Sequence, residues 1–162
     1  QWTGLRFFNV YGPNEYHKGG QRSVVPQFWQ QIRETGGARL FRSHDPDYAD
    51  GGQLRDFVHV RDTVSVILWL AGHADVSGIF NLGTGEARSF DDMAAAIFDA
   101  MSEPASVEYV DMPDTVRNQY QYFTEARMDR LRAAGYDRPF TSLEDGVRSY
   151  VRDFLETNDP YV

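Results

Sequence analysis

Apolar and polar positions along the chain follow two patterns, one typical of buried strands and one typical of amphipathic helices. Short runs with bulky side chains on both faces, closed by glycine or proline, are typical of strands inside a parallel sheet. The longer runs carry apolar residues three or four positions apart, as one face of a helix does. We expect strands at residues 4–10, 39–42, 54–60, 78–82 and 106–110.

Helices are expected between these strands. The clearest one follows Ser89, which forms a capping box with Asp92 and precedes a regular apolar stripe that Pro104 ends. The other expected helices cover 23–34, capped by Ser23, then 61–74, 124–135, and a last helix that Thr141 and Glu144 cap. Residues 112–122 are expected to be extended. In the second helix the predicted inner face is Val64, Ile67, Leu68 and Ala71.

Composition indicates a folded globular protein, with 41% hydrophobic and 14% aromatic residues among 162. The net charge of −8 argues against nucleic-acid binding, yet a local group of arginines can still hold a small anion. The chain has no cysteine, which excludes disulfides and cysteine-ligated metals and fits a cytoplasmic protein. The longest apolar run, residues 64–71, is too short to span a membrane.

Lys18 is the first candidate functional residue. It follows the turn at Gly12 and Pro13, beyond the end of the first strand, where open α/β sheets bind their ligands. It is also the only lysine in the chain. Such a lysine can act as an acid or base or hold a phosphate; the alternative is a solvated surface lysine.

Other candidates come from residue type and position. The planar fork of Arg55 can grip a diphosphate, although an ordinary ion pair is the alternative. Tyr120 and Tyr122 can stack on a ligand or simply pack over the core. The turn at residues 83–85 lacks the third glycine of a phosphate loop, so we interpret it as a tight turn. The four histidines have no metal-ligand spacing, and no metal site is expected.

Three runs, LRFFNVYGP (5–13), RDFVHVRD (55–62) and FNLGTG (80–85), resemble the extended short-chain dehydrogenase/reductases that act on nucleotide sugars. Within that superfamily, EYHKG (15–19), YQYFT (120–124) and LRAAGY (131–136) are similar to the ADP-L-glycero-D-manno-heptose 6-epimerase family. The resemblance implies an α/β fold of mixed short strands and helices, the C-terminal substrate-binding part of an extended Rossmann-type enzyme. It also implies a bacterial cytoplasmic enzyme for the heptose precursor of lipopolysaccharide.

The same resemblance assigns roles to residues. The implied enzyme uses NADP to oxidise C6 of an ADP-sugar and to return the hydride to the other face, with Lys18 as one of two catalytic bases. Val10 and Lys18 match cofactor-contacting positions, and Asn9 matches a substrate-contacting position. The remaining substrate-binding matches are Gly20, Gln27, Phe41, Arg42, Ser43, His44, Arg55 and Tyr120.

The chain also departs from the family pattern. Residues 45–54 look like an insertion, Gln27 replaces a usual histidine, and Arg42 and Ser43 replace Glu-Gly. No Tyr-x-x-x-Lys motif and no glycine-rich cofactor motif occurs. Since the chain starts at Gln1 without methionine and enters a strand by about residue 4, we expect the C-terminal part of a longer protein, inactive alone.

The resemblance divides the chain between two domains. Residues 1–13 and 61–88 belong to the dinucleotide side, whereas 14–60 and 89–162 form the substrate domain with the C-terminal helix. Elements on the dinucleotide side would lose packing partners, so we expect exposed apolar surface there and a homo-oligomer. The alternatives are another nucleotide-sugar 4-epimerase or 4,6-dehydratase, or a non-catalytic nucleotide-sugar-binding module.

Overall fold

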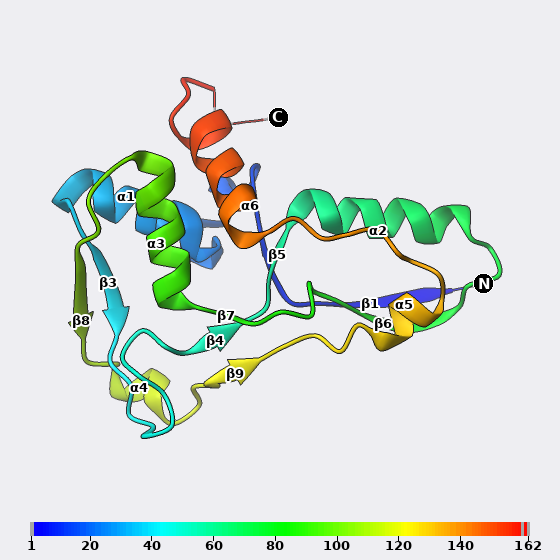
Figure 1. Ribbon diagram of the computed structural model, residues 1–162, viewed down its shortest axis with the longest axis horizontal. Coiled ribbons are helices and arrows are strands. Elements are labelled where there is room, and N and C mark those ends of the chain that lie inside the picture. The colour runs from blue at the N-terminus through cyan, green and yellow to red at the C-terminus, as the bar shows by residue number, and fades with distance from the viewer. Residues whose placement is uncertain (1, 160, 162) are drawn as a thin grey trace.

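The computed structural model describes residues 2–159 and 161 and has the expected α/β architecture (Figure 1). Short strands pair in small sheets, and helices connect and cover them. In chain order the elements are β1 (Thr3–Phe7), β2 (Asn9–Tyr11), η1 (Tyr16–Gln21), α1 (Val24–Thr35), β3 (Ala38–Phe41), β4 (Leu54–Arg55), β5 (Phe57–His59), α2 (Val60–Gly72), β6 (Gly78–Leu82), β7 (Arg88–Ser89), α3 (Phe90–Met101), β8 (Val107–Val110), α4 (Asp114–Arg117), β9 (Phe123–Thr124), α5 (Asp129–Ala133), α6 (Leu143–Tyr150) and η2 (Val151–Leu155).

Most strand pairs are parallel, as the expected α/β class requires. β1 pairs with β6 in the register Leu5 to Phe80, β2 pairs with β5, and β3 pairs with β8. β4 joins β9 in parallel and β7 in antiparallel orientation. α2 and the turn after it carry the chain from β5, the partner of β2, to β6, the partner of β1.

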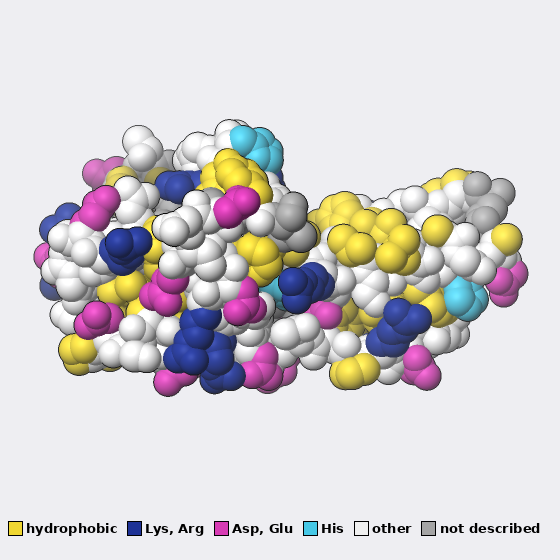
Figure 2. Space-filling model, turned by 90° about the horizontal axis from the view of Figure 1, so that it is seen from above, with side chains coloured by type: hydrophobic (Ala, Val, Ile, Leu, Met, Phe, Trp, Pro, Cys, Tyr) yellow, Lys and Arg dark blue, Asp and Glu magenta, His cyan; other side chains and the backbone are white. Residues whose placement is uncertain are grey.

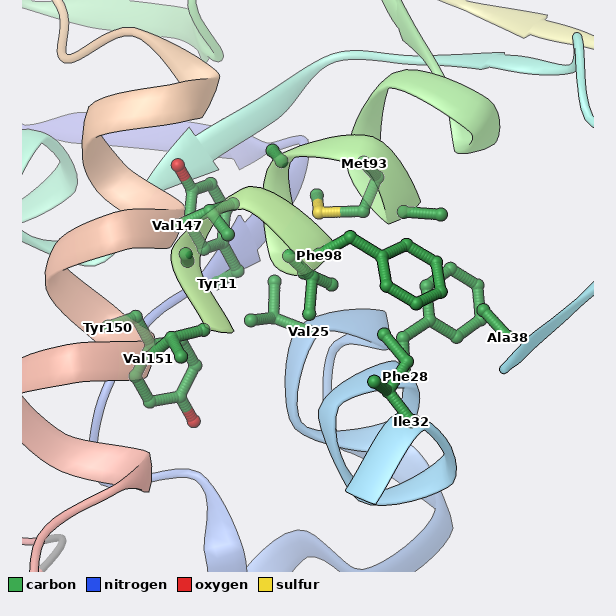
Figure 3. Packing of buried hydrophobic residues seen from close by; sticks show 14 of the residues in the cluster. Tyr11, Val25, Phe28, Ile32, Ala38, Met93, Phe98, Val147, Tyr150 and Val151 are labelled. Carbon is green, nitrogen blue, oxygen red and sulfur yellow. The ribbon is translucent and has the colours of Figure 1, made fainter. Parts of the chain in front are cut away.

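Two regions with separate cores make up the molecule. The helical region contains α1, α3, α6, η2 and the β3–β8 pair, and its core includes Val25, Met93 and Val147 (Figure 3). The α2 region contains α2, α5 and the β1–β6 pair, and its core gathers around Val66, Phe80 and Leu131. Figure 1 shows the two regions side by side, with β4, β7 and β9 below.

The orientation of α2 differs from the sequence prediction. Its buried side chains are Thr63, Val66 and Leu70, whereas Val64, Ile67 and Leu68, predicted to face inward, are exposed. The helix carries apolar residues all around, so periodicity alone does not show which side packs on the strands. The exposed apolar surface expected on the dinucleotide side is nevertheless present, because Phe7 of β1 and Ile79 of β6 are exposed as well.

The predicted strand at residues 54–60 is two strands. It breaks at Asp56, so that β4 pairs with β7 and β9 while β5 pairs with β2. The Asp56 carboxylate is fully buried and accepts hydrogen bonds from loop groups, among them the backbone N–H of Ala126 at 3.0 Å. This interaction turns the chain from one sheet into the next.

One predicted helix cap is correct, and two others differ from the prediction. Ser89 and Asp92 form the predicted capping box of α3. The last helix begins one residue late, because Ser142 caps it through the N–H of Asp145, while the Thr141 hydroxyl donates to Asp62. Ser23 precedes α1 as predicted, but its hydroxyl makes no cap, because it donates to Glu15.

Two predictions in the segment after β8 are wrong. Residues 112–122, expected to be extended, contain the short helix α4. The helix expected from Thr124 starts only at Asp129, because Thr124 instead pairs with Arg55 as part of β9. Met128 and Leu131 do point inward as predicted. Sheet pairing with β4 has overridden a helical pattern there.

Candidate functional site

A cavity of about 490 Å³ lies between α1 and the strands β3 and β4. The apolar face of α1 and the strand β3 form two of its walls, and the start of α3 and the segment before β9 contribute the others. The cavity is lined by four residues that the sequence analysis predicts to bind substrate, namely Gln27, Phe41, Arg55 and Tyr120. The other lining residues are Val24, Phe28, Gln31, Arg39, Leu40, Gln53, Phe90 and Val110.

Arg55 contributes a positively charged guanidinium group to the lining of this cavity. Its carbon lies 5.1 Å from the ring centroid of Tyr120 and 5.8 Å from that of Phe90, and one of its nitrogens donates to a backbone carbonyl of β4 at 2.8 Å. These contacts hold the planar fork and leave its other N–H groups to bind oxygen atoms. The other lining arginine, Arg39, already pairs with Glu108 at 2.8 Å. Arg55 is therefore the group best placed to receive an anion.

Tyr120 provides a second polar group beside Arg55. Burial raises the pKa of its hydroxyl, and the positive charge of Arg55 opposes that shift only in part. The hydroxyl is thus protonated at neutral pH and can donate a hydrogen bond. Phe41 meets the ring of Tyr120 edge to face, with centroids 6.4 Å apart. Gln27 uses its amide nitrogen for the carbonyl of Arg22, at 2.9 Å, so its carbonyl oxygen can accept from a ligand.

The predicted substrate residues 42–44 lie beside this cavity, without lining it. The backbone N–H of His44 donates to the hydroxyl of Tyr122 at 2.9 Å, and the rings of Tyr122 and Tyr120 are 5.5 Å apart. Arg42 is held by carboxylates, 3.6 Å from Asp111 and 4.0 Å from Asp50. Ser43 is tied to the same acidic loop by its N–H, which donates to Asp50 at 2.8 Å.

The remaining predicted residues lie elsewhere. Lys18 and Gly20 are exposed on η1 and do not line the cavity. Asn9 is exposed and Val10 half-buried on β2, a strand that ends at the turn of Gly12 and Pro13. The structure therefore brings part of the predicted set together, and the contacts of these four residues with substrate or cofactor stay predictions.

Residues that sequence reasoning missed hold the site in place. Gln53 is buried and donates from its amide nitrogen to the carbonyl of Phe41, at 3.2 Å. Asp56 accepts the N–H groups of Thr84 and Gly85, at 2.7 and 2.9 Å, and thereby fixes the residue next to Arg55. The predicted tight turn at 83–85 is thus present, and its N–H groups bind an internal carboxylate. No sequence signal separates Asp56 from a solvent-facing aspartate.

The parallel strands fit a nucleotide cofactor on one side. β2 and β5 end together at Tyr11 and His59, and ligands of open α/β sheets bind beyond such carboxyl ends. At this edge Gly12 has φ +144°, and a side chain there would clash with Val60, so the backbone turns closely against α2. Within residues 2–159 and 161 no cluster of three or more acidic, histidine or cysteine side chains is arranged to hold a metal ion.

The helices of the described residues are all too short or too polar to cross a membrane.

Comparison with known proteins gives close relatives for nearly the whole chain. It is 55% identical over 160 residues to the ADP-L-glycero-D-manno-heptose-6-epimerase of Nitratidesulfovibrio vulgaris (strain DP4), covering 99% of the chain and 50% of that relative. It is 44% identical over 168 residues to the protein of the same name from Fusobacterium nucleatum subsp. nucleatum, covering 100% and 51%. The chain spans about half the length of these curated relatives.

Solved structures agree on the fold. The Helicobacter pylori ADP-L-glycero-D-manno-heptose-6-epimerase superposes with a TM-score of 0.76 at 28% identity, covering 96% of this chain and 45% of that one. The Thermus thermophilus UDP-glucose 4-epimerase, solved in complex with NAD, gives 0.69 at 26% identity, with 91% and 44% covered. The α/β class and the resemblance to extended short-chain dehydrogenase/reductases are confirmed.

The family model described as NAD dependent epimerase/dehydratase family matches residues 1–83. This family is described as NAD dependent, which implies a nicotinamide cofactor. The matched segment includes β1, β2, the cavity strands β3 and β4, and Arg55. Because it makes up just over half of the 162 residues, the chain belongs to the NAD-dependent epimerase/dehydratase family.

Proposed function

We propose that this chain is the substrate-binding portion of an NADP-dependent epimerase that inverts C6 of ADP-glycero-manno-heptose. The observation that carries the proposal is the cavity in which Arg55 lies between Tyr120 and Phe90. The names of the relatives at 44–55% identity supply the substrate class. We place the reaction in the cytoplasm, in the synthesis of the heptose precursor of lipopolysaccharide.

Arg55 would bind the diphosphate of the ADP-sugar. A guanidinium fork forms paired hydrogen bonds with phosphate oxygens, and the half-buried setting strengthens them relative to bulk water. The hydroxyl of Tyr120 would donate to the same group or to a sugar hydroxyl. The aromatic and aliphatic walls of the cavity, Phe28, Leu40 and Phe41, would cover the remaining surface of the ligand.

Lys18 would act on the proton of the C6 hydroxyl, with Asn9 and Gly20 as further substrate contacts. Inversion of C6 removes a hydride from one face and returns it to the other, so it needs a proton acceptor for the oxidation on one side and a proton donor for the reduction on the other. NADP, contacted by Val10 and Lys18, would supply the hydride acceptor and donor. The second base lies outside this chain, which contains no Tyr-x-x-x-Lys motif.

We also propose that the chain works as the C-terminal part of a longer protein and within a homo-oligomer. Support comes from the length of the relatives, twice that of the chain, and from the exposed apolar side chains of α2, β1 and β6. Sedimentation of the chain alone should show association that increases with concentration. A stable monomer at every concentration would contradict this proposal.

The binding proposal is tested by calorimetric titration of the full-length protein with ADP-, UDP- and dTDP-sugars. We expect selective binding of the ADP-sugar, with Arg55→Ala weakening it at least tenfold, because a charge-assisted pair of hydrogen bonds contributes about 1.5–3 kcal/mol each. Arg33→Ala is the matched control, since Arg33 is exposed on α1 outside the cavity and stacks on Trp29.

Each outcome leads to a different assignment. Selectivity for UDP- or dTDP-sugars would favour a 4-epimerase or 4,6-dehydratase of the same family, such as the UDP-glucose 4-epimerase with a similar fold. Binding of an ADP-sugar without any turnover by the full-length protein would favour a non-catalytic binding module. Equal affinities of Arg55→Ala and Arg33→Ala would show that the cavity is not the diphosphate site.

A further inference from the structure

In the segment that carries Lys18, Tyr16 packs against the core of the helical region, whereas residues 17–21 are exposed. None of the residues Tyr16–Gln21 of η1 is fully buried, and the turn is interrupted at Gly19, where φ is +54° and ψ is −126°. Its internal hydrogen bonds are short-range, from the N–H of Lys18 to the carbonyl of Glu15 and from Arg22 to Gly19. Such a segment needs an external tie to hold Lys18 in one place.

Glu15 provides that tie from the residue before η1. One carboxylate oxygen accepts the backbone N–H of Ser23 at 2.6 Å, and the other accepts the hydroxyl of Ser23, also at 2.6 Å. Ser23 follows η1 directly after Arg22, so these bonds join the two ends of the segment. The hydroxyl of Tyr150 donates to the second oxygen at 3.0 Å and thereby connects the segment to α6.

Tyr150 itself is fixed by the core of the helical region. It is fully buried, and in Figure 3 its hydroxyl oxygen projects from the lower edge of the packed cluster. Burial and the nearby Glu15 carboxylate raise the pKa of this hydroxyl, so it stays protonated and remains a donor. The tie from Glu15 therefore ends on a rigid element.

Burial of the Glu15 carboxylate costs desolvation free energy. Glu15 is only 4% exposed, and no cationic side chain forms an ion pair with it among the described residues. A buried carboxylate without a cation gains little stability over an apolar side chain of the same size. The hydroxyl of Ser23 donates to Glu15 and therefore does not cap α1. The position of Glu15 is therefore better explained by the shape that its hydrogen bonds give to the 15–23 segment than by a gain in stability.

We propose that Glu15 is a positioning residue for Lys18: its carboxylate closes the 15–23 segment and aligns the lysine with the sugar. The inference rests on the proposed function, in which Lys18 is a catalytic base. A base must stay within about 0.5–1 Å of its productive position, and a displacement of that size can reduce the rate about 10²-fold. Glu15 does not line the cavity of Arg55, so substrate affinity should not depend on it.

The test is a graded series in the full-length enzyme. Glu15→Met keeps the volume and removes both oxygens, so kcat should fall about 10²-fold while KM changes less than threefold. Glu15→Gln keeps one acceptor for the N–H of Ser23 and can donate to the two hydroxyls, so it should restore much of the rate. Glu34→Met, at the exposed end of α1, is the control and should match the wild type.

Hydrogen exchange gives a readout that does not depend on activity. Backbone amides at 16–22 should exchange faster in Glu15→Met than in the wild type or Glu34→Met, with no change in α3. A purely structural role would instead lower Tm and leave kcat per folded molecule unchanged, and that result would overturn the proposal. If Glu15→Met does not fold, Tyr150→Phe and Ser23→Ala decide, since each removes one donor and should lower kcat severalfold.

The variant Lys18→Met distinguishes a failure of the proposed catalytic role of Lys18 from a failure of the positioning role of Glu15. Full activity in Lys18→Met would refute the catalytic role of Lys18 and, with it, any role for Glu15 in aligning a base. An inactive Lys18→Met together with wild-type kcat in Glu15→Met would refute the positioning role alone. An inactive Lys18→Met, a kcat about 10²-fold lower in Glu15→Met and a largely restored kcat in Glu15→Gln together support the proposal.

Discussion

The helical region and the α2 region both pack helices against parallel strands, but they differ in how completely the apolar side chains are covered. In the helical region, helices from distant parts of the chain surround the core, and Val25, Met93, Ile97 and Val147 are fully buried. In the α2 region one side of the helix packs on the strands, while Leu68 is 66% exposed. Figure 2 shows the resulting band of hydrophobic side chains over α2.

This difference indicates which part of the molecule is self-sufficient. A parallel strand pair is normally covered on both faces, and β1 also leaves one edge without a partner strand among the described residues. The cavity that contains Arg55 lies against the complete core, whereas the incomplete core belongs to elements that the sequence assigns to the dinucleotide side. The division of the chain into these two domains stays a prediction, and the burial pattern agrees with it.

Core truncations should show the largest contrast. Ile97→Ala in the helical region should reduce the free energy of unfolding by about 2–5 kcal/mol, because it leaves a cavity in a closed core. Leu68→Ala in α2 should change it by less than about 0.5 kcal/mol in the chain alone. Urea denaturation of both variants measures the difference. Equal losses would show that α2 is already covered, for example by a second copy.

Asp56 lies between β4 and β5 and binds the loops at 84–85 and 126, and its replacement should have the next largest effect. Asp56→Asn presents an amide N–H₂ to backbone donors that now bind a carboxylate, so we expect a loss of about 1–3 kcal/mol. Thermal unfolding should also become less cooperative, because the loops at 84–85 and 126 lose their common anchor. Asp137→Asn, at an exposed position, serves as control. A single unchanged transition would mean that the regions are held together elsewhere.

The ion pair between Arg88 and Glu144 should have the smallest effect. The atoms are 2.7 Å apart, but both side chains are partly exposed, so Arg88→Ala should cost at most about 1 kcal/mol. Arg88 lowers the pKa of Glu144, so the contribution is present above the ordinary value of 4.5 and is lost as the pH falls below it. The denaturation midpoints of wild type and variant should therefore differ at pH 7 and lie closer together at pH 3.5. A difference as large at pH 3.5 as at pH 7 would contradict the assignment.

Local signals in the sequence predicted much of the fold. The capping box at Ser89 and the strand at residues 78–82 are both encoded by neighbouring residues, and the structure contains them. Errors occur where distant residues compete. The hydroxyl of Thr141 donates to Asp62, so Ser142 caps the last helix instead. Thr124 pairs with Arg55 of β4 and does not start a helix.

The candidate site was predictable in its parts but not in its assembly. Arg55 and Tyr120 were selected by residue type, yet they are brought together by strand pairing between β4 and β9, which no local pattern encodes. Phe90 enters the site only because the cap at Ser89 places it at the start of α3. Asp56 and Glu15 were missed for a common reason, since burial of a carboxylate depends on donors far away in the sequence.

The contacts between the first and last elements also bear on biosynthesis. Tyr11 donates to the carbonyl of Leu143 across 132 positions, and Glu15 binds Tyr150 across 135. At ordinary translation rates, on the order of 10 s separates the synthesis of these partners. During that time Glu15 can bind Ser23 but not Tyr150, so the segment with Lys18 lacks its connection to the helical region until α6 leaves the ribosome.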